Sequence, residues 1–508
     1  MDTLGALDEA VAAREQRART DHARLLQRDT TLWQPAAEVT GRWLGWLDSL
    51  DRAEEHLRLL RPIAQGVRDE GVEHVVLVGM GGSSLFPLVL SGACGSAVDH
   101  PVLHVLDSTD PAAVARVEAS VDWEHTVVVA SKSGTTVETL AHLDLLHERL
   151  TAAVGAGAGA RIVVITDPGS PLQARAAADG YRAIVAGDVD VGGRYSALSP
   201  FGLLPAALLG VDLDELLGRA RAAAARWIDD PWSDAGPACL GTLIACGVAD
   251  GRDALHVVVD ARAGMFGAWI EQLVAESSGK DGTGSLPVVV RSADDVVVTE
   301  RAVVVAIGEV DGIEQLTHAR VPLLRIPWSG CLELGAEVLR WMQAVPLACA
   351  QLGVDPFDQP DVASAKSATA DALDQGSEPD APVALDRVRD IAARAGYVAI
   401  LAYVDPEGEV ADRLADVAAP LARDLGVPVT VGIGPRYLHS TGQLHKGGRN
   451  DGVFLVVVGD DPEDVTIPGR AFGFARLKRA QAAGDIAALR GAGRHVAVTT
   501  PEELLGAV

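Results

Sequence analysis

The sequence predicts an α/β protein with two doubly wound parallel sheets and a smaller C-terminal α/β unit. Short runs of Val, Ile and Leu alternate with longer helical stretches, which is typical of parallel strands that helices cover on both faces. The alternation restarts twice along the chain. With 508 residues the chain is too long for one hydrophobic core, so two or three domains are expected.

The first series of strands follows an N-terminal helical segment in which Leu44, Leu47 and Leu50 recur at three-residue spacing. The second series follows a helix and connector over Leu208–Asp234. The predicted strands of the first series are His74–Gly79, Val102–Asp107, Thr126–Ser131 and Arg161–Thr166, and those of the second are Leu255–Asp260, Leu286–Val290, Ala302–Ile307 and Val321–Ile326.

A polar stretch with Pro and Asp, Ser367–Ala384, predicts a linker before the third series. That series comprises Tyr397–Val404, Val427–Ile433 and Val453–Val458. We therefore expect a first doubly wound domain with its N-terminal helices over 1–225, a second doubly wound domain with the linker over 226–385, and a C-terminal α/β unit over 386–508.

Composition and charge exclude several classes of protein. The formal net charge of −27 argues against general nucleic-acid binding, because such a surface repels a phosphate backbone. The five cysteines show neither a disulfide framework nor metal-ligand spacing. No apolar stretch approaches the roughly 20 residues that a membrane span needs, and Met1–Arg19 lacks a signal-peptide core. We expect a cytoplasmic protein without a membrane partner.

Two loops that directly follow predicted strands indicate a ligand site. In Gly79–Ser84 (GMGGSS), glycines let the backbone approach a ligand and serines add hydroxyl donors. A Gly-rich turn from strand to helix is as often purely structural, and this one lacks the spacing of a dinucleotide-binding loop. Ser131–Thr136 (SKSGTT) brings four hydroxyls, one ammonium and a run of backbone N–H groups to a helix N-terminus. This combination fits a phosphate monoester. A plain helix N-cap is the alternative, although one cap needs only one hydroxyl.

Three other segments carry charged candidates. Arg194 follows two glycines in GGRYS, and Glu276 ends an apolar helix in ESSGK. A partly desolvated carboxylate is poised as a general base, although a lone Glu at a helix end is usually exposed. In FDQPDVASAK, Gln359 and Lys366 project from a turn and its following helix, or form an ordinary helix entry.

The segment Gly434–Gly448 (GPRYLHSTGQLHKGG) gathers two histidines, an arginine and a lysine among glycines. No acidic or Cys partner stands at metal-ligand spacing, which argues against a metal site. A functional loop at a domain junction is the interpretation that we favour.

Taken together and in this order, these segments resemble the glucose-6-phosphate isomerase family from about Gly71 to the end of the chain. FDQPDVASAK and GPRYLHSTGQLHKGG are most similar to the isomerase half of bacterial transaldolase–isomerase fusions, but the segment before the first sheet is far too short for the transaldolase barrel. The resemblance implies two sugar-isomerase (SIS) domains, reversible isomerisation of glucose 6-phosphate and fructose 6-phosphate, and a homodimer.

The resemblance also implies roles for individual residues. Glu276 falls on the family's general base, Arg194 on the arginine beside the developing enediolate, and Lys366 on the family's lysine. A carboxylate can take and return the carbon proton while the arginine stabilises negative charge, so neither a metal nor a redox cofactor is needed. The positions implied to bind substrate are Gly82, Ser83, Ser131, Lys132, Ser133, Thr135, Thr136 and Gln359.

The chain departs from the family at the histidine that helps to open the sugar ring, which a neighbouring subunit often supplies. His318 is the one histidine between Glu276 and Phe357, and we take it as the candidate, with His439 or His445 as possible substitutes. Ser278 also replaces the family's usual asparagine. Two alternatives stay open, namely an isomerase of another hexose phosphate and a non-catalytic SIS-fold sensor.

Overall fold

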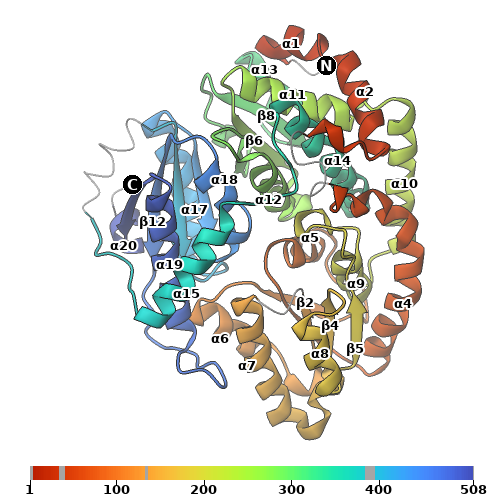
Figure 1. The fold of residues 1–508 in the computed structure, drawn as a ribbon, viewed down its shortest axis with the longest axis vertical. Coiled ribbons are helices and arrows are strands. Elements are labelled where there is room, and N and C mark those ends of the chain that lie inside the picture. The colour runs from red at the N-terminus through yellow and green to blue at the C-terminus, as the bar shows by residue number, and fades with distance from the viewer. Residues whose placement is uncertain (1–3, 34–40, 132–135, 384–394, 507–508) are drawn as a thin grey trace.

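A computed structural model describes residues 4–33, 41–131, 136–383 and 395–506. Its strands form three separate parallel sheets with helices on their faces (Figure 1). The α/β fold class predicted from the apolar runs is confirmed. The division into domains at residues 225 and 385 stays a prediction, and residues 384–394 lie outside the described part of the chain.

The first sheet has the order β2-β1-β3-β4-β5, and every neighbouring pair is parallel. The sequence predicted four of its strands within two residues but missed β5, which is short and half-exposed at the sheet edge. The strands are β1 (His74–Val78), β2 (Val102–Leu106), β3 (Thr126–Ser131), β4 (Ile162–Thr166) and β5 (Ala183–Ala186).

The second and third sheets repeat one topology, with orders β7-β6-β8-β9 and β11-β10-β12-β13. In each sheet the second strand lies on one side of the first, and the third and fourth strands lie on the other side. The strands are β6 (Ala254–Val259), β7 (Leu286–Val290), β8 (Ala302–Ile307), β9 (Leu323–Ile326), β10 (Tyr397–Tyr403), β11 (Val429–Ile433), β12 (Gly452–Val458) and β13 (His495–Thr499).

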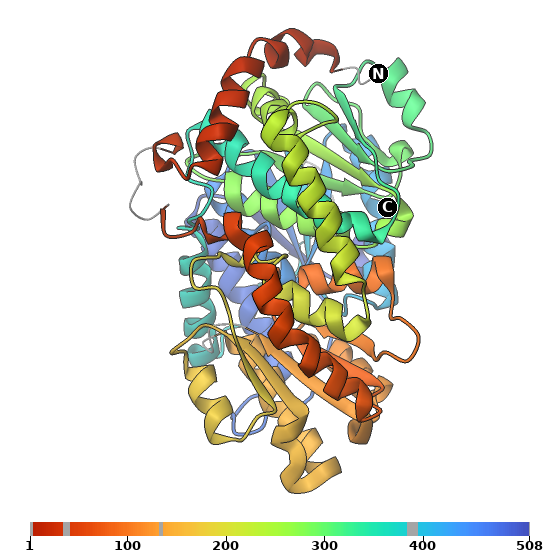
Figure 2. The same ribbon diagram turned by 90° about the vertical axis from the view of Figure 1, so that its right-hand side faces the viewer.

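Helices cover these sheets and join the first two units. Figure 2 shows the N-terminal helices, in red, along one side of the molecule, where α2 contacts α11 and α14 while α4 contacts α9. The helices are α1 (Asp8–Ala12), α2 (Glu15–Leu26), α4 (Ser49–Asp69), α5 (Leu85–Cys94), α6 (Pro111–Ser120), α7 (Val137–Val154), α8 (Pro171–Ala178), α9 (Pro200–Leu209), α10 (Leu213–Asp229), α11 (Pro237–Ala249), α12 (Phe266–Ser278), α13 (Ile313–His318), α14 (Leu334–Leu352), α15 (Val362–Gln375), α17 (Glu409–Leu425), α18 (Gly442–Gly447), α19 (Phe474–Gly491) and α20 (Pro501–Leu505).

The predicted linker over 367–384 is wrong in its first half, because α15 continues to Gln375 and ends at Gly376, which adopts a left-handed conformation. The polar residues of this segment lie on a helix whose other face contacts α19 of the C-terminal unit. Figure 1 shows α15, in cyan, lying along the blue C-terminal unit. Polarity alone therefore did not distinguish a half-exposed helix from a linker.

Buried ion pairs tie the C-terminal unit to the first one. Arg436 donates two hydrogen bonds to Asp107, at 2.8 and 2.7 Å. Lys478 of α19 is fully buried and lies 2.9 Å from Asp110, which also caps α6. Burying such charges is favourable only when they are paired this closely, so these contacts fix how the two units meet.

Candidate functional site

The two glycine- and hydroxyl-rich loops begin side by side. Strands β1 and β3 are neighbours, with Val78 opposite Ala130, and the chain leaves them toward opposite sides of the sheet. Such a topological switch point is where open parallel sheets bind their ligands. Lys132, Ser133 and Thr135 lie outside the described residues, as does the side chain of Ser131.

Thr136, the last residue of that loop, stands at the N-cap of α7, yet its side chain makes no capping hydrogen bond. The hydroxyl is therefore not used to close the helix end, which removes the simple N-cap interpretation for this residue.

The Gly79–Ser84 loop packs against the loop that carries Gly193 and Arg194. Gly82 lies so close to Gly193 that a Cβ atom on Gly82 would stand 1.8 Å from the Gly193 carbonyl oxygen. The hydroxyl of Ser196 donates to the carbonyl oxygens of both glycines, at 3.2 and 2.7 Å. Ser83 beside this contact is buried. The missing side chain at Gly82 thus lets the Arg194 loop reach the switch point.

This contact predicts that Gly82→Ala disrupts the site. The methyl group must displace main chain, which we expect to cost about 1–3 kcal/mol of stability. Activity should fall at least about tenfold, since the Arg194 loop moves with it. Thermal unfolding and steady-state kinetics measure both effects.

Gly92→Ala on α5 is the matched control for Gly82→Ala. A Cβ atom there meets its nearest neighbour, Gly264 Cα, at an ordinary 3.6 Å. This variant should therefore keep wild-type stability and activity. Equal behaviour of the two variants would contradict the close-contact argument.

Glu276 and Arg194 face each other in the interior. Glu276 lies in the last turn of α12, and its Oε1 is 3.1 Å from Arg194 Nη1. Their side chains are 10% and 5% exposed, so this pair is shielded from solvent. Gln272, one turn earlier on α12, donates from Nε2 to Glu276 Oε2 at 3.1 Å. The carboxylate is therefore held by a donor on each oxygen.

Arg194 is anchored by the loop that precedes α15. Its Nη2 donates to the carbonyl oxygens of Pro356 (2.7 Å) and Asp358 (3.0 Å). Lys280, the lysine of ESSGK, is buried and pairs with the Asp358 carboxylate at 2.5 Å. The same loop thus orients the guanidinium and leads directly to the helix that carries Lys366.

Two polar atoms beside Glu276 are buried without a hydrogen-bond partner among the described residues. They are Arg194 Nε and Gln272 Oε1. Such atoms are rare in protein interiors. One donor and one acceptor flanking a carboxylate suit the hydroxyl and carbonyl groups of a sugar.

A cavity of about 300 Å³ lies at the junction of the first and C-terminal units, and neither Glu276 nor Arg194 lines it. Its size is at the lower end of the range for small-molecule sites. The polar side chains that line it are Thr136, Glu138, Lys366, Thr369, His439 and Gln481. Lys366 is exposed, whereas Gln359 lies exposed in the turn before α15 and does not line this cavity.

His439 enters this cavity from the GPRYLHSTGQLHKGG segment. Its Nε2 lies 3.1 Å from Glu138 Oε1, while its backbone carbonyl accepts a hydrogen bond from Gln272 at 2.7 Å. Burial alone would raise the pKa of Glu138, but the hydrogen bond and charge of His439 outweigh it and lower that pKa. One amide, Gln272, therefore connects the Glu276 cluster to His439.

The structure does not bring His318 to this site. His318 is the exposed last residue of α13 and does not line the cavity. His445 is buried between aromatic rings, and burial lowers its pKa to about 3. Within one chain neither residue lines the cavity, and a role of His318 at the site of a neighbouring subunit stays a prediction.

Sequence reasoning missed Gln272, Glu138 and Gln481. Gln272 stands four residues before Glu276 on one helix, so helical spacing alone would have placed it on the same face. Glu138 follows Thr136 by two residues. Gln481 carries no local signal, because its partners are 343 and 372 residues away in the chain.

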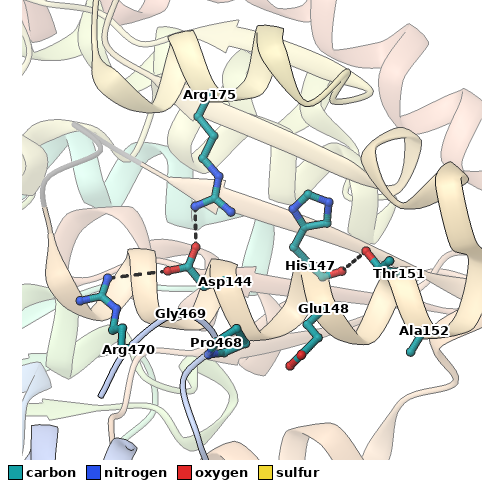
Figure 3. Close-up of a pocket in the computed structure, with 9 residues that line it drawn as sticks. All are labelled: Asp144, His147, Glu148, Thr151, Ala152, Arg175, Pro468, Gly469 and Arg470. Atoms are coloured by element: carbon teal, nitrogen blue, oxygen red, sulfur yellow. Dashed lines mark hydrogen bonds and ion pairs between the residues drawn. The ribbon is translucent and has the colours of Figure 1, made fainter. Parts of the chain in front are cut away.

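A larger, open hollow of about 850 Å³ lies elsewhere, between α7, α8 and residues 468–470 (Figure 3). Three of its charged side chains pair with one another, since Asp144 pairs with Arg175 at 2.6 Å and with Arg470 at 3.7 Å. The hollow is shallow and holds no residue of the predicted site, so we place the site at the smaller cavity. Among the described residues no group of three or more His, Cys, Asp or Glu is arranged for a metal ion, and no helix is both long and apolar enough to cross a membrane.

The doubly wound sheets and the cluster at the switch point define an α/β protein of the SIS type. The phosphoglucose isomerase family matches residues 8–309, and the chain belongs to this family. A glucose-6-phosphate isomerase of Rubrobacter xylanophilus is 37% identical over 252 residues, 47% of this chain and 57% of the relative. One of Thermus thermophilus is 42% identical over 185 residues, 36% of this chain and 43% of the relative.

The chain thus spans about half the length of these curated relatives. A solved structure of a hypothetical protein from Thermus thermophilus aligns with a TM-score of 0.61 and 28% identity, covering 73% of this chain and 99% of that protein. A glucose-6-phosphate isomerase from Chlamydia trachomatis aligns with a TM-score of 0.57 over 73% of this chain and 86% of its own, at 19% identity, which shows the fold alone.

Proposed function

We propose that this chain is a glucose-6-phosphate isomerase that interconverts glucose 6-phosphate and fructose 6-phosphate through a cis-enediol. The observation that carries the proposal is the shielded pair of Glu276 and Arg194 beside the switch point. Family membership and the names of the matched relatives support it. We further propose a cytoplasmic homodimer that binds a sugar phosphate and needs no metal or redox cofactor.

In this proposal Glu276 removes the proton from C2 and returns it to C1, a second proton passes from the C2 hydroxyl to the C1 oxygen, and Arg194 stabilises the negative charge of the enediolate. Its unpartnered Nε–H is the donor available for that charge. The loop Ser131–Thr136, with Gly82 and Ser83, holds the phosphate. Lys366 adds a positive charge to the cavity that Thr136 lines.

For ring opening we propose His439 in place of His318. His439 lines the cavity and is oriented by Glu138, whereas His318 lies exposed on α13. An imidazole held by a carboxylate can take the proton of the anomeric hydroxyl and deliver one to the ring oxygen. All these groups belong to one chain.

The activity is tested by incubating the purified protein with fructose 6-phosphate and coupling glucose 6-phosphate to a dehydrogenase. Activity well above that of Glu276→Gln supports the proposal. Equal catalytic efficiencies of the wild type and Glu276→Gln would contradict the proposal. Parallel assays with mannose 6-phosphate and an amino-sugar phosphate decide the substrate, and tight binding without turnover would indicate a sensor.

We expect His439→Asn to slow ring opening by about 100-fold, within the usual range for a lost general acid–base group. The interconversion of glucose 6-phosphate anomers, followed by NMR exchange, measures this step without isomerisation. The matched variant is His318→Asn, which should behave as wild type. If only His318→Asn lost anomer exchange, His318 and not His439 would be the ring-opening residue.

A further inference from the structure

The amide of Gln481 lies between two groups of the first unit and is almost completely buried, at 1% exposure. Gln481 belongs to α19 of the C-terminal unit. Its Nε2 donates to Glu138 Oε1 at 2.9 Å, and its Oε1 accepts from the Thr109 hydroxyl at 2.5 Å. Both hydrogen-bonding ends of the amide are therefore used.

These two hydrogen bonds fix which way the amide points. The Glu138 carboxylate can only accept hydrogen bonds, so the donor end of the amide has to face it, and the buried Thr109 hydroxyl then donates to the acceptor end. The Oε1 atom of Glu138 then accepts from Gln481 and from His439 at once. A carboxylate oxygen held by two donors at angles to each other has little freedom to rotate.

The same helix that carries Gln481 is itself fixed to the first unit. Lys478, one turn earlier on α19, is fully buried and pairs with Asp110 at 2.9 Å. Asp110 follows Thr109 in the chain, so the segment between β2 and α6 binds both Lys478 and Gln481. The position of Gln481 relative to Glu138 is thus set by an ion pair as well as by its own amide.

From this geometry we propose that Gln481 is a positioning residue for sugar ring opening. It aligns the Glu138 carboxylate with His439, and the C-terminal unit thereby completes the site within the chain. This inference rests on the proposed isomerase function and deepens it. Gln481 itself exchanges no proton, because an amide is neither acid nor base at neutral pH.

The test measures ring opening by itself, in a Glu276→Gln background where isomerisation is blocked. Gln481→Met keeps the length of the side chain and removes the donor. We expect it to slow the NMR exchange of glucose 6-phosphate anomers by about 10- to 100-fold, the effect of losing a hydrogen bond to a charged group. The KM for isomerisation in the Glu276-containing protein should change less than about threefold, because the phosphate is held by other residues.

Thr109→Val is the second variant, since it removes the hydroxyl that donates to the Gln481 amide oxygen and leaves Gln481 in place. We expect a smaller loss in the same direction, about threefold, because the amide keeps its hydrogen bond to Glu138 but loses the donor that holds its other end. Circular dichroism establishes that both variants are folded. A loss confined to KM, or unchanged anomer exchange in folded Gln481→Met, would overturn the inference.

The outcomes separate this inference from the function on which it rests. A wild-type protein that interconverts the two hexose phosphates, combined with normal ring opening in Gln481→Met, refutes only the positioning role. A wild-type protein without that activity refutes the proposed function and the positioning role together.

Discussion

Replacing Glu276 by Gln is expected to lower kcat by about 10³- to 10⁴-fold, near the upper range for loss of a general base. The amide cannot accept the C2 proton, yet it has the shape of the carboxylate. Arg194 keeps its hydrogen bonds to Pro356 and Asp358 in the variant. We therefore expect a folded protein whose KM changes little, as measured by the coupled assay and by thermal unfolding.

Glu271→Gln is the matched control for this experiment. Glu271 lies on the same helix and is half-buried, and desolvation raises its pKa to about 7. It lines a different cleft, between the second and C-terminal units. The same chemical change there should leave kcat within about twofold of the wild type. Comparable losses in the two variants would mean that Glu276 acts through the structure and not as the base.

The fold was predictable because the strands are buried on both faces and are therefore apolar without interruption. Val75–Val78 of β1 and the whole of β8 have almost no exposed surface. The two missed strands carry short apolar runs, since β5 has only four residues and β13 has three apolar residues between His495 and Thr499. A run this short does not distinguish a strand from a loop.

The site was predictable where its residues are adjacent in the chain. The Ser131–Thr136 loop indicates a ligand by itself, because several donors follow one strand, whereas the glycine loop alone is a weak signal. Glu276 and Arg194 gained their roles only from the resemblance, since neither motif alone distinguishes a buried pair from two surface residues. Their mutual contact at 3.1 Å is a property of the packed domains.

The histidine of the site was not predictable from local sequence. The position of His318 between two motifs favoured that residue, whereas His439 meets Glu138 across 301 residues. That contact exists because the C-terminal unit docks on the first through Arg436 and Lys478. No local pattern encodes a docking geometry, so only the assembled structure places His439 in the cavity.

Replacing Arg194 by Lys is expected to lower kcat by about 10²- to 10³-fold, the usual effect of removing one donor to a developing oxyanion. The N–H donors of a lysine all sit on a single nitrogen. A lysine therefore cannot hold Pro356, Asp358 and Glu276 in the planar arrangement of a guanidinium. The buried Nε–H, which has no partner among the described residues, would also be gone. Steady-state kinetics should show the loss in kcat and kcat/KM alike, as for an interaction made in the transition state.

Arg340→Lys provides the control, because Arg340 has nearly the same surroundings away from the site. It is buried, pairs with Glu337 at 3.0 Å and donates to the carbonyl oxygens of Asp234 and Ala235. Both lysine variants should lose a similar stability, about 1–3 kcal/mol, through unmade hydrogen bonds. Only Arg194→Lys should lose the chemical step. If Arg340→Lys were equally inactive, the effect of Arg194 would be one of folding, and the charge on the enediolate would need another donor.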